Sequence, residues 1–351
     1  MLLEVSGLSV DYVLDRADVR AVDNVSFTLD RGEFLGIVGE SGCGKSTLLF
    51  AIAQLLAPPA RTVAGSVTFK GSNLVGLTDG QLSAVRWRDL SVVMQSAMNA
   101  LNPVKSIGAQ FRDVMRAHGK TSRDEIGTRS AEVLRMVGID QAHLRSFPHQ
   151  LSGGMRQRAM IAMALLFTPD LIVMDEPTSA LDVVAQRSLM VQIKELQQQL
   201  GFAVVFVTHD MSLVSHFSDR LLVMYAGQVV EFGPTRTVFD TPSHPYSKSL
   251  LDAFPSIRGP KVPLIGIPGD PPNLAKPPAG CRFHPRCPVA QDRCRSEAPD
   301  LYTVSVAVPV ATGESSPAVL SRCLAHHPTE PLGVELVATV VAEPIATEVQ
   351  S

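Results

Sequence analysis

Hydrophobic residues follow two different periods along the chain. Near the N-terminus, residues 2–13 and 20–30 alternate apolar and polar positions in short runs, which predicts strands joined by turns. The stretches 33–38, 170–177 and 202–210 each contain a short apolar run. The first run is followed by Gly39, the second is followed by Asp175, and the third comes directly after Gly201. Such short runs are typical of buried strands in a parallel sheet. Both kinds of strand are therefore expected in one chain.

Helical patterns separate the buried strands. Residues 106–145 have helical spacing with Gly at plausible helix ends, and we assign about 96–165 to a mostly helical subdomain. Residues 155–169 read as a helix terminated by Pro169, and 184–201 as an amphipathic helix stopped by Gly201. Strands that alternate with helices predict an α/β fold built on a largely parallel sheet.

The composition changes after about residue 245. A Pro-rich stretch, 267–280, reads as a linker to four cysteines, and the residues beyond 328 are rich in Val, Ala and Glu without a period. We expect a main domain over 1–245, a Cys-containing region over 246–328, and a disordered tail over 329–351.

Composition and charge exclude several classes of protein. The formal net charge of the 351 residues is −3, and aromatic residues make up 5%. Both values disfavour a nucleic-acid partner. The chain contains no apolar run of the roughly 18 residues that a membrane span needs, and its start lacks the pattern of a signal peptide. We expect a cytoplasmic protein whose membrane role, if any, comes through a partner.

The stretch "GESGCGKS", residues 39–46, matches the phosphate-binding pattern G-x-x-x-x-G-K-[ST] between an apolar strand and a helix. Glycines let backbone N–H groups close around phosphate oxygens, and the helix N-terminus attracts negative charge. Lys45 is expected to reach the β- and γ-phosphates, and the Ser46 hydroxyl to ligate Mg²⁺. A plain Gly-rich turn is the alternative. The candidate ATP-binding residues here are Gly39, Glu40, Ser41, Gly42, Cys43, Gly44, Lys45, Ser46 and Thr47.

Two further buried strands end in polar residues. Asp175 and Glu176 follow the apolar run of 171–174, and His209 follows the next such strand. Parallel neighbouring strands would bring these ends to the phosphate loop, where Asp175 would hold Mg²⁺ and Glu176 would activate water as a general base. His209 could then contact the γ-phosphate and orient the water. A solvated acidic turn is the alternative reading.

The order of the motifs resembles the ATP-binding subunits of ABC transporters. The phosphate loop is followed by Gln95 in "VVMQ", "LSGG" at 151, "LIVMDEP" at 171, "SALD" at 179 and His209. The stretches "FPHQLSGGMRQRAMIAMAL", "PSHPYSKSLL" and "GCRFHPRCP" narrow the resemblance to the oligopeptide/dipeptide importer ATPases, and it covers about residues 2–325. Met155 stands where many ABC proteins have Gln, as is usual in this subfamily.

The resemblance implies a P-loop NTPase fold of ABC type: a RecA-like core with an antiparallel β subdomain, a helical subdomain and a small Cys-containing C-terminal extension. It implies an ATPase that powers import of oligopeptides or dipeptides. Glu176, His209 and Gln95 would be catalytic, Ser46, Gln95 and Asp175 would bind Mg²⁺, and Tyr12 would stack on adenine. Other solutes such as nickel chelates, a soluble non-transport ABC protein, and a redox protein are the alternatives.

The resemblance also implies partners. Two ATPase subunits would stack head to tail, so that Leu151, Ser152, Gly153, Gly154 and Asp182 complete the ATP site of the other subunit. That subunit would be a paralogue or a second copy. The pair would dock on two membrane-spanning permease subunits at the cytoplasmic face of the inner membrane, and an extracytoplasmic solute-binding protein would take part indirectly.

The late cysteines have the spacing Cys281-x5-Cys287-x6-Cys294-x28-Cys323, which lacks the close pair of a zinc ribbon. Four thiolates near prolines suit a [4Fe–4S] cluster, and the resemblance implies one there. Zinc, with His284, His326 or His327 as substitute ligands, and four free thiols remain the alternatives.

Overall fold

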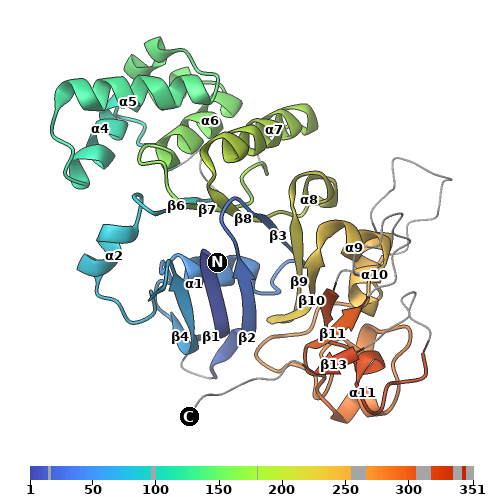
Figure 1. The fold of residues 1–351 in the computed structure, drawn as a ribbon. Coiled ribbons are helices and arrows are strands. Elements are labelled where there is room, and N and C mark those ends of the chain that lie inside the picture. The colour runs from blue at the N-terminus through green and yellow to red at the C-terminus, as the bar shows by residue number, and fades with distance from the viewer. Residues whose placement is uncertain are drawn as a thin grey trace.

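The computed structural model describes residues 1–14, 17–95, 100–179, 181–253, 266–305, 318–334 and 342–344. Figure 1 shows a central sheet, a smaller antiparallel sheet beside it, a group of helices above, and a C-terminal region at the opposite end of the central sheet. The arrangement is the expected α/β one.

The centre of the fold is a nine-stranded sheet in the order β13-β11-β12-β10-β9-β3-β8-β7-β6. Neighbouring strands from β6 to β9 are parallel, and β10 pairs antiparallel with β9. Every residue of β3, β7 and β8 is buried, because both faces of these strands are covered. The bounds are β3 Phe34–Val38, β6 Leu90–Val93, β7 Leu171–Asp175, β8 Ala203–Val207, β9 Arg220–Tyr225 and β10 Gln228–Pro234.

The N-terminal alternation forms the second sheet, in the order β2-β1-β4-β5 with antiparallel pairs. The helix α1, Lys45–Ile52, packs between this sheet and the central one, so its apolar residues share a core with both. Burial on both sides fixes the start of α1, which carries the phosphate loop. The strand bounds are β1 Leu3–Tyr12, β2 Val19–Leu29, β4 Ala60–Phe69 and β5 Ser72–Asn73.

The predicted helical subdomain contains α4 (Ile107–Ala117), α5 (Arg123–Met136) and α6 (Gly153–Ala164), with the short 3₁₀ turns η1 (Gln141–Arg145) and η2 (Pro148–Gln150). Ser106, Ser122 and Ser152 cap the three α-helices by accepting a hydrogen bond from a backbone N–H of the first turn. The next helix, α7 (Val183–Leu200), ends as expected at Gly201, whose φ is 75°. Sequence analysis did not predict α2 (Asp79–Val85).

The helix predicted to run to Pro169 ends earlier. α6 stops at Ala164, and Thr168 has a left-handed φ of 51°. Arg129 of α5 stabilises this end, because its guanidinium donates to the carbonyls of Leu165 (2.7 Å) and Leu166 (2.9 Å). A side chain from a distant helix satisfies the final turn, and the sequence of α6 alone did not reveal it.

The C-terminal region is continuous with the central sheet. β12 (Ala318–Ser321) pairs with β10, β11 (Tyr302–Ser305) pairs with β12, and β13 (Ala342–Pro344) pairs with β11. The helices α8 (Met211–Phe217), α9 (Thr235–Asp240), α10 (Pro245–Asp252) and α11 (Arg293–Ser296), and the turns η3 (His284–Arg286) and η4 (Leu324–His326), complete the fold.

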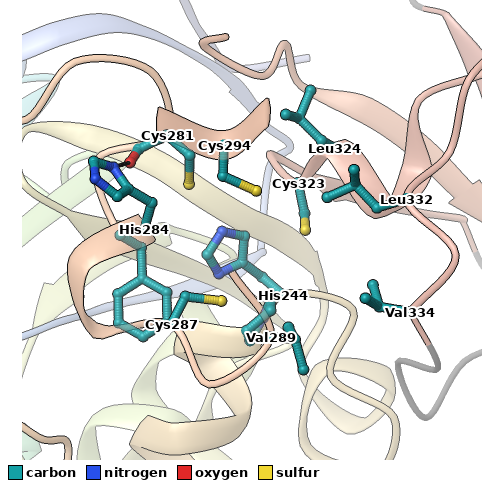
Figure 2. Close-up of a pocket in the computed structure, with 12 residues that line it drawn as sticks. His244, Cys281, His284, Cys287, Val289, Cys294, Cys323, Leu324, Leu332 and Val334 are labelled. Atoms are coloured by element: carbon teal, nitrogen blue, oxygen red, sulfur yellow. Dashed lines mark hydrogen bonds between the residues drawn. The ribbon is translucent and has the colours of Figure 1, made fainter. Parts of the chain in front are cut away.

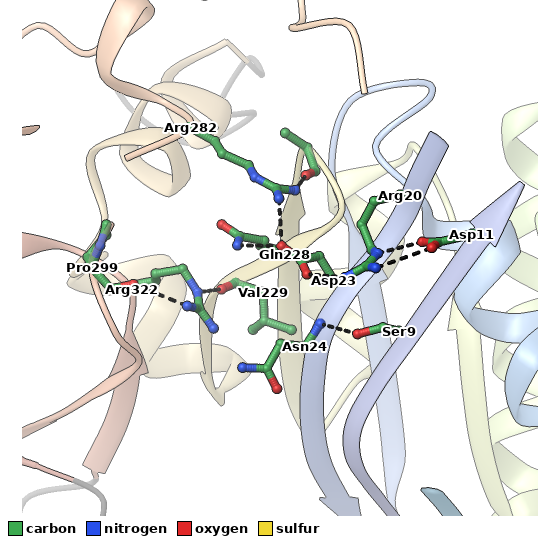
Figure 3. Close-up of polar contacts among 11 residues, drawn as sticks. Ser9, Asp11, Arg20, Asp23, Asn24, Gln228, Val229, Arg282, Pro299 and Arg322 are labelled. Carbon is green, nitrogen blue, oxygen red and sulfur yellow. Dashed lines mark hydrogen bonds and ion pairs between the residues drawn. The ribbon is translucent and has the colours of Figure 1, made fainter. Parts of the chain in front are cut away.

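Polar contacts tie this region to the rest of the chain. The buried Glu231 carboxylate on β10 accepts hydrogen bonds from the backbone N–H groups of Ser243 (2.6 Å) and His244 (3.1 Å), and burial raises its pKa to about 7. Figure 3 shows Arg282 reaching Asp23 of β2 and Arg322 reaching the carbonyl of Val229 on β10. The bonds of Arg282 and Arg322 therefore cross the boundary expected at residue 245.

The structure describes part of the tail expected over 329–351. β13 lies within 329–351 and pairs with β11, and residues 329–334 are also described. The rest of that prediction falls on 335–341 and 345–351, outside the described residues. No helix among the described residues has the length and apolar character that crossing a membrane requires.

Candidate functional site

The loop between β3 and α1 is possible only with glycine at two of its positions. Gly39 has φ 151° and Gly44 has φ 104°, and a Cβ at either would lie 2.2 Å from a backbone oxygen, that of Met224 or of Ala21. No side chain fits there. The loop is therefore pressed against neighbouring backbone while its other side faces a cavity.

Lys45 and Ser46 begin α1 where the sequence predicted phosphate and metal contacts. Lys45 is buried, and its ammonium donates to the carbonyls of Gly39 and Glu40 at 2.8 Å each. The Ser46 hydroxyl donates to Oδ1 of Asp175 at 3.0 Å. Burial raises the pKa of Asp175, and the Ser46 hydrogen bond opposes that shift. Two of the three ligands expected for Mg²⁺, Ser46 and Asp175, thus lie side by side, whereas the amide nitrogen of the third, Gln95, donates to Glu176.

The three expected catalytic residues are also in contact. Nε2 of Gln95 lies 2.5 Å from Oε2 of Glu176, and Nε2 of His209 lies 2.5 Å from Oε1. Glu176 has a left-handed φ of 45°, and its N–H donates to the carbonyl of Val207 on β8 at 2.9 Å. The parallel pairing of β6, β7 and β8 brings all three residues to one end of the sheet, as the sequence predicted.

A cavity of about 400 Å³ joins these groups. Tyr12 lines it, with its hydroxyl 3.2 Å from Oγ1 of Thr47. Three of the predicted ATP-binding residues, Gly39, Glu40 and Cys43, do not line this cavity. The cavity is lined by Tyr12, Val19, Ala21, Ser41, Gly42, Gly44, Lys45, Ser46, Thr47, Gln95, Glu176, His209 and Leu274.

Leu274 was missed by sequence reasoning because its Pro-rich segment reads as a linker. Pro271, Pro272 and Leu274 instead line a smaller cavity of about 170 Å³ against Glu40 and Cys43 of the phosphate loop. Leu274 is a partly buried apolar residue packed on the core, and an apolar side chain among the prolines was the available signal that part of the segment packs there.

The residues of the "LSGG" stretch, 151–154, lie outside the cavity at the phosphate loop. Ser152 accepts a hydrogen bond from the Met155 N–H at 3.2 Å, which confirms it as the cap of α6. Ser152 and Gly154 line a cavity of about 260 Å³ that shares no residue with the one at the phosphate loop. A Cβ on Gly154 would meet nothing within 4 Å, so this face is open. Leu151 is buried, and Asp182 caps α7 by accepting from the Ala185 N–H at 2.9 Å.

Gln157 links α6 to the residues that follow β7. Its buried side-chain amide donates to the carbonyl of Pro177, the residue after Glu176. This hydrogen bond connects α6 to the backbone next to Glu176.

The four late cysteines line one apolar pocket of about 20 Å³. In the view of Figure 2, the thiols of Cys281, Cys294 and Cys323 lie on one side of the His244 ring and that of Cys287 on the other. Burial raises the thiol pKa of Cys287 to about 11 and of Cys323 to about 12, so both favour the protonated form.

No metal centre is apparent in the part of the chain that the structure describes. There, no group of three or more His, Cys, Asp or Glu side chains is arranged to hold a metal ion. Of the expected substitute zinc ligands, His284 lines the thiol pocket but His326 and His327 do not, because His326 instead bonds the Ser243 carbonyl at 2.6 Å. His244 lines the pocket and was not predicted.

Comparison with known families gives two matches. Residues 22–179 match the ABC transporter model, and residues 230–294 match the model described as oligopeptide/dipeptide transporter, C-terminal region. Together they include the phosphate loop, the signature, the catalytic strand and three of the four late cysteines.

Similar proteins match over most of the chain. The oligopeptide transport ATP-binding protein OppD of Salmonella typhimurium is 43% identical over 301 residues, which are 85% of this chain and 90% of that protein. The dipeptide transport ATP-binding protein DppD of Caldanaerobacter subterraneus is 38% identical over 301 residues, which are 85% of this chain and 92% of that protein.

Solved structures agree with the fold. The ATP-binding cassette MJ0796, in a dimeric post-hydrolysis state bound to ADP and Pi, matches with a TM-score of 0.60 at 30% identity, covering 67% of this chain and 99% of that one. The chain therefore belongs to the ABC transporter family, in the group of ATP-binding proteins that carry the oligopeptide/dipeptide transporter C-terminal region.

Proposed function

We propose that this chain is the ATP-hydrolysing subunit of an importer for oligopeptides or dipeptides. The observation that carries the proposal is the single cavity that collects Lys45, Ser46 and Glu176 beside Asp175. The relatives named for oligopeptide and dipeptide transport support the solute class. Import of another solute, such as a nickel chelate, is the second candidate, since the substrate is selected outside this chain.

The contacts suggest a division of labour in hydrolysis. Backbone N–H groups of the phosphate loop and the ammonium of Lys45 would hold the phosphates, which requires Lys45 to leave the two carbonyls it now contacts. Ser46 and Asp175 would hold Mg²⁺, which neutralises charge on the β- and γ-phosphate oxygens. Glu176 would take a proton from the attacking water, and His209 and Gln95 would keep its carboxylate in place.

The separation of the two cavities supports a head-to-tail pair of ATPase subunits. Ser152, Gly153 and Gly154 lie at the N-terminus of α6, where backbone N–H groups and the helix dipole attract anions. Because their cavity is distinct from that of the phosphate loop, the phosphate they bind would belong to a second ATPase subunit. Asp182 would lie at the same interface. The pair would dock on two permease subunits at the cytoplasmic side of the membrane, supplied by an extracytoplasmic binding protein.

A variant pair in a reconstituted transporter tests this arrangement. When the second ATPase is a paralogue, Lys45→Ala should abolish ATP binding at the site built on this chain's phosphate loop. Gly153→Asp should instead weaken ATP binding at the partner's phosphate loop, because its carboxylate would repel the triphosphate. Photolabelling with azido-ATP, followed by separation of the two subunits, assigns each lost site. Loss of labelling on this chain by Gly153→Asp would contradict the arrangement.

We further propose that Cys281, Cys287, Cys294 and Cys323 bind an iron–sulfur cluster, with zinc as the alternative. Thiolates are ligands for either group, and all four thiols line one apolar pocket, although no three of them are arranged around a metal position in the described structure. A bound cluster would supply fixed links among the segments that carry the four thiols. Because burial favours the neutral thiols, binding would have to release protons, and so should weaken as the pH falls.

Anaerobic purification tests the cluster. The wild-type chain is expected to be brown and to contain about four iron atoms per chain, as a [4Fe–4S] cluster requires. Cys287→Ser should lose most of the iron, whereas Cys43→Ser, in the phosphate loop, should retain it. A colourless protein with stoichiometric zinc would identify the alternative, and a protein with neither metal would leave four free thiols.

A further inference from the structure

Glu40 of the phosphate loop has its carboxylate bound outside the nucleotide cavity. Glu40 is absent from the lining of that cavity, and its carboxylate is held by Arg286 of the C-terminal region. Nη1 of Arg286 donates to Oε2 at 2.6 Å and Nη2 donates to Oε1 at 2.9 Å. This is a bidentate pair, the geometry in which arginine and carboxylate bind most strongly.

The backbone of Glu40 is also held from the C-terminal side. Its N–H donates to the hydroxyl of Tyr246, a fully buried residue of α10, at 2.9 Å. Its carbonyl accepts from the ammonium of Lys45 at 2.8 Å. Glu40 therefore connects the C-terminal region directly to the lysine expected to bind phosphate.

Arg286 is itself fixed in place. It ends the turn η3, and only 6% of its side chain is exposed. Its Nε donates to the carbonyl of Pro268 at 2.8 Å, and Nη2 reaches the carbonyl of Ile267 at 3.4 Å. The pair with Glu40 raises the pKa of Arg286 and keeps it charged. Arg286 is buried and Glu40 is half-buried, and the bidentate pair with these extra hydrogen bonds holds both side chains in one geometry.

The segment that begins at Ile267 and Pro268 continues to the phosphate loop. Beyond Pro268, which Arg286 holds, Pro271 and Leu274 lie against Glu40 and Gly42, and Leu274 also lines the nucleotide cavity. Arg286 thus holds both the second residue of the loop and the start of the segment that walls the cavity.

We infer that Arg286 is a positioning residue for nucleotide binding, acting in its own subunit through Glu40. The inference rests on the proposed function, since it assigns ATP to the cavity. Arg286 does not line the cavity and acts by fixing the side chain of Glu40 and by neutralising its carboxylate, which the phosphate loop carries. Without Arg286, an unpaired carboxylate would remain on the loop and repel the phosphates.

The test measures equilibrium binding of ATP to the full-length chain without Mg²⁺, so that hydrolysis does not interfere. Arg286→Met keeps most of the packing volume and removes the charge, and it should weaken binding about tenfold or more, since a close unpaired charge at low dielectric acts at this scale. Adding Glu40→Gln to Arg286→Met removes the unpaired carboxylate and should recover at least about threefold of the loss. Arg286→Lys, which keeps a charge, should lie between the wild type and Arg286→Met.

Arg282→Met is the matched control. Arg282 lies four residues before Arg286 and also pairs with a carboxylate, that of Asp23 (Figure 3). Its hydrogen bonds go to Asp23 and to the carbonyl of Ala226, and none of them goes to the phosphate loop. Its variant should bind ATP within about threefold of the wild type. Thermal unfolding of each variant separates loss of the fold from loss of positioning.

Three results would overturn the inference: a folded Arg286→Met that binds ATP as the wild type does, an equal loss in Arg282→Met, or no recovery from Glu40→Gln. The rescue is decisive because a purely architectural role of Arg286 would not be relieved by neutralising Glu40. A wild-type chain that fails to bind ATP would refute the proposed function instead, so the two failures are distinguishable.

Discussion

The variant Glu176→Gln is expected to hydrolyse ATP about 10²–10⁴ times more slowly than the wild type, the usual cost of losing a general base. Glutamine has nearly the same shape and can still contact Gln95 and His209, which hold the carboxylate at 2.5 Å each. It cannot accept a proton from water. The measurement is phosphate release by the assembled transporter under single-turnover conditions, which reports chemistry directly.

Binding should survive this substitution. Lys45, Ser46 and Tyr12 are unchanged, so ATP should accumulate uncleaved and hold the two ATPase subunits together, which size-exclusion chromatography with ATP can detect. Hydrolysis close to the wild-type rate would show that another group serves as the base. Loss of ATP binding would show that Glu176 is needed for the structure of the site.

The variant Gly44→Ala is expected to lower the free energy of unfolding by about 3 kcal/mol or more. Its φ of 104° is a region that side chains rarely adopt, which by itself costs about 1–3 kcal/mol. The new Cβ would also lie 2.2 Å from the carbonyl oxygen of Ala21, so the backbone would have to move. Denaturant unfolding without nucleotide measures the effect on the fold separately from any effect on binding.

Gly42→Ala provides the matched comparison in the same loop. Gly42 also has a left-handed φ, 77°, but a Cβ there would meet nothing within 4 Å. Its cost should stay near the 1–2 kcal/mol of the left-handed conformation alone. Equal losses in the two variants would show that the contact with Ala21 is not what requires glycine at position 44.

The phosphate loop and the acidic end of β7 could be predicted because their functional residues lie close together in the sequence. The glycines, Lys45 and Ser46 are consecutive or nearly so, and Asp175 and Glu176 follow directly from the strand that carries them. A parallel sheet then brings separate strand ends together without further information.

The contacts of the C-terminal region could not be predicted in this way. Arg286 and Glu40 are 246 positions apart, and no sequence pattern around either residue indicates that the two form an ion pair. The segment 267–280 has so many prolines that it resembles a linker, although Leu274 lines the nucleotide cavity. β11 and β12 are only four residues long each and become strands by pairing onto a sheet that already exists.

The continuation of the central sheet has a consequence for the solubility of the chain. If the fold ended at residue 245, β10 would be an edge strand, and the backbone groups of Glu231 and Phe232 that pair with Ser321 and Leu320 would face solvent. Such an edge is a template for strand addition by other chains and so for aggregation. β12 covers it, and the strands added beyond β10 are all shorter than β10, with four residues each in β12 and β11 and three in β13. The C-terminal region therefore also protects the edge strand β10 from pairing with other chains.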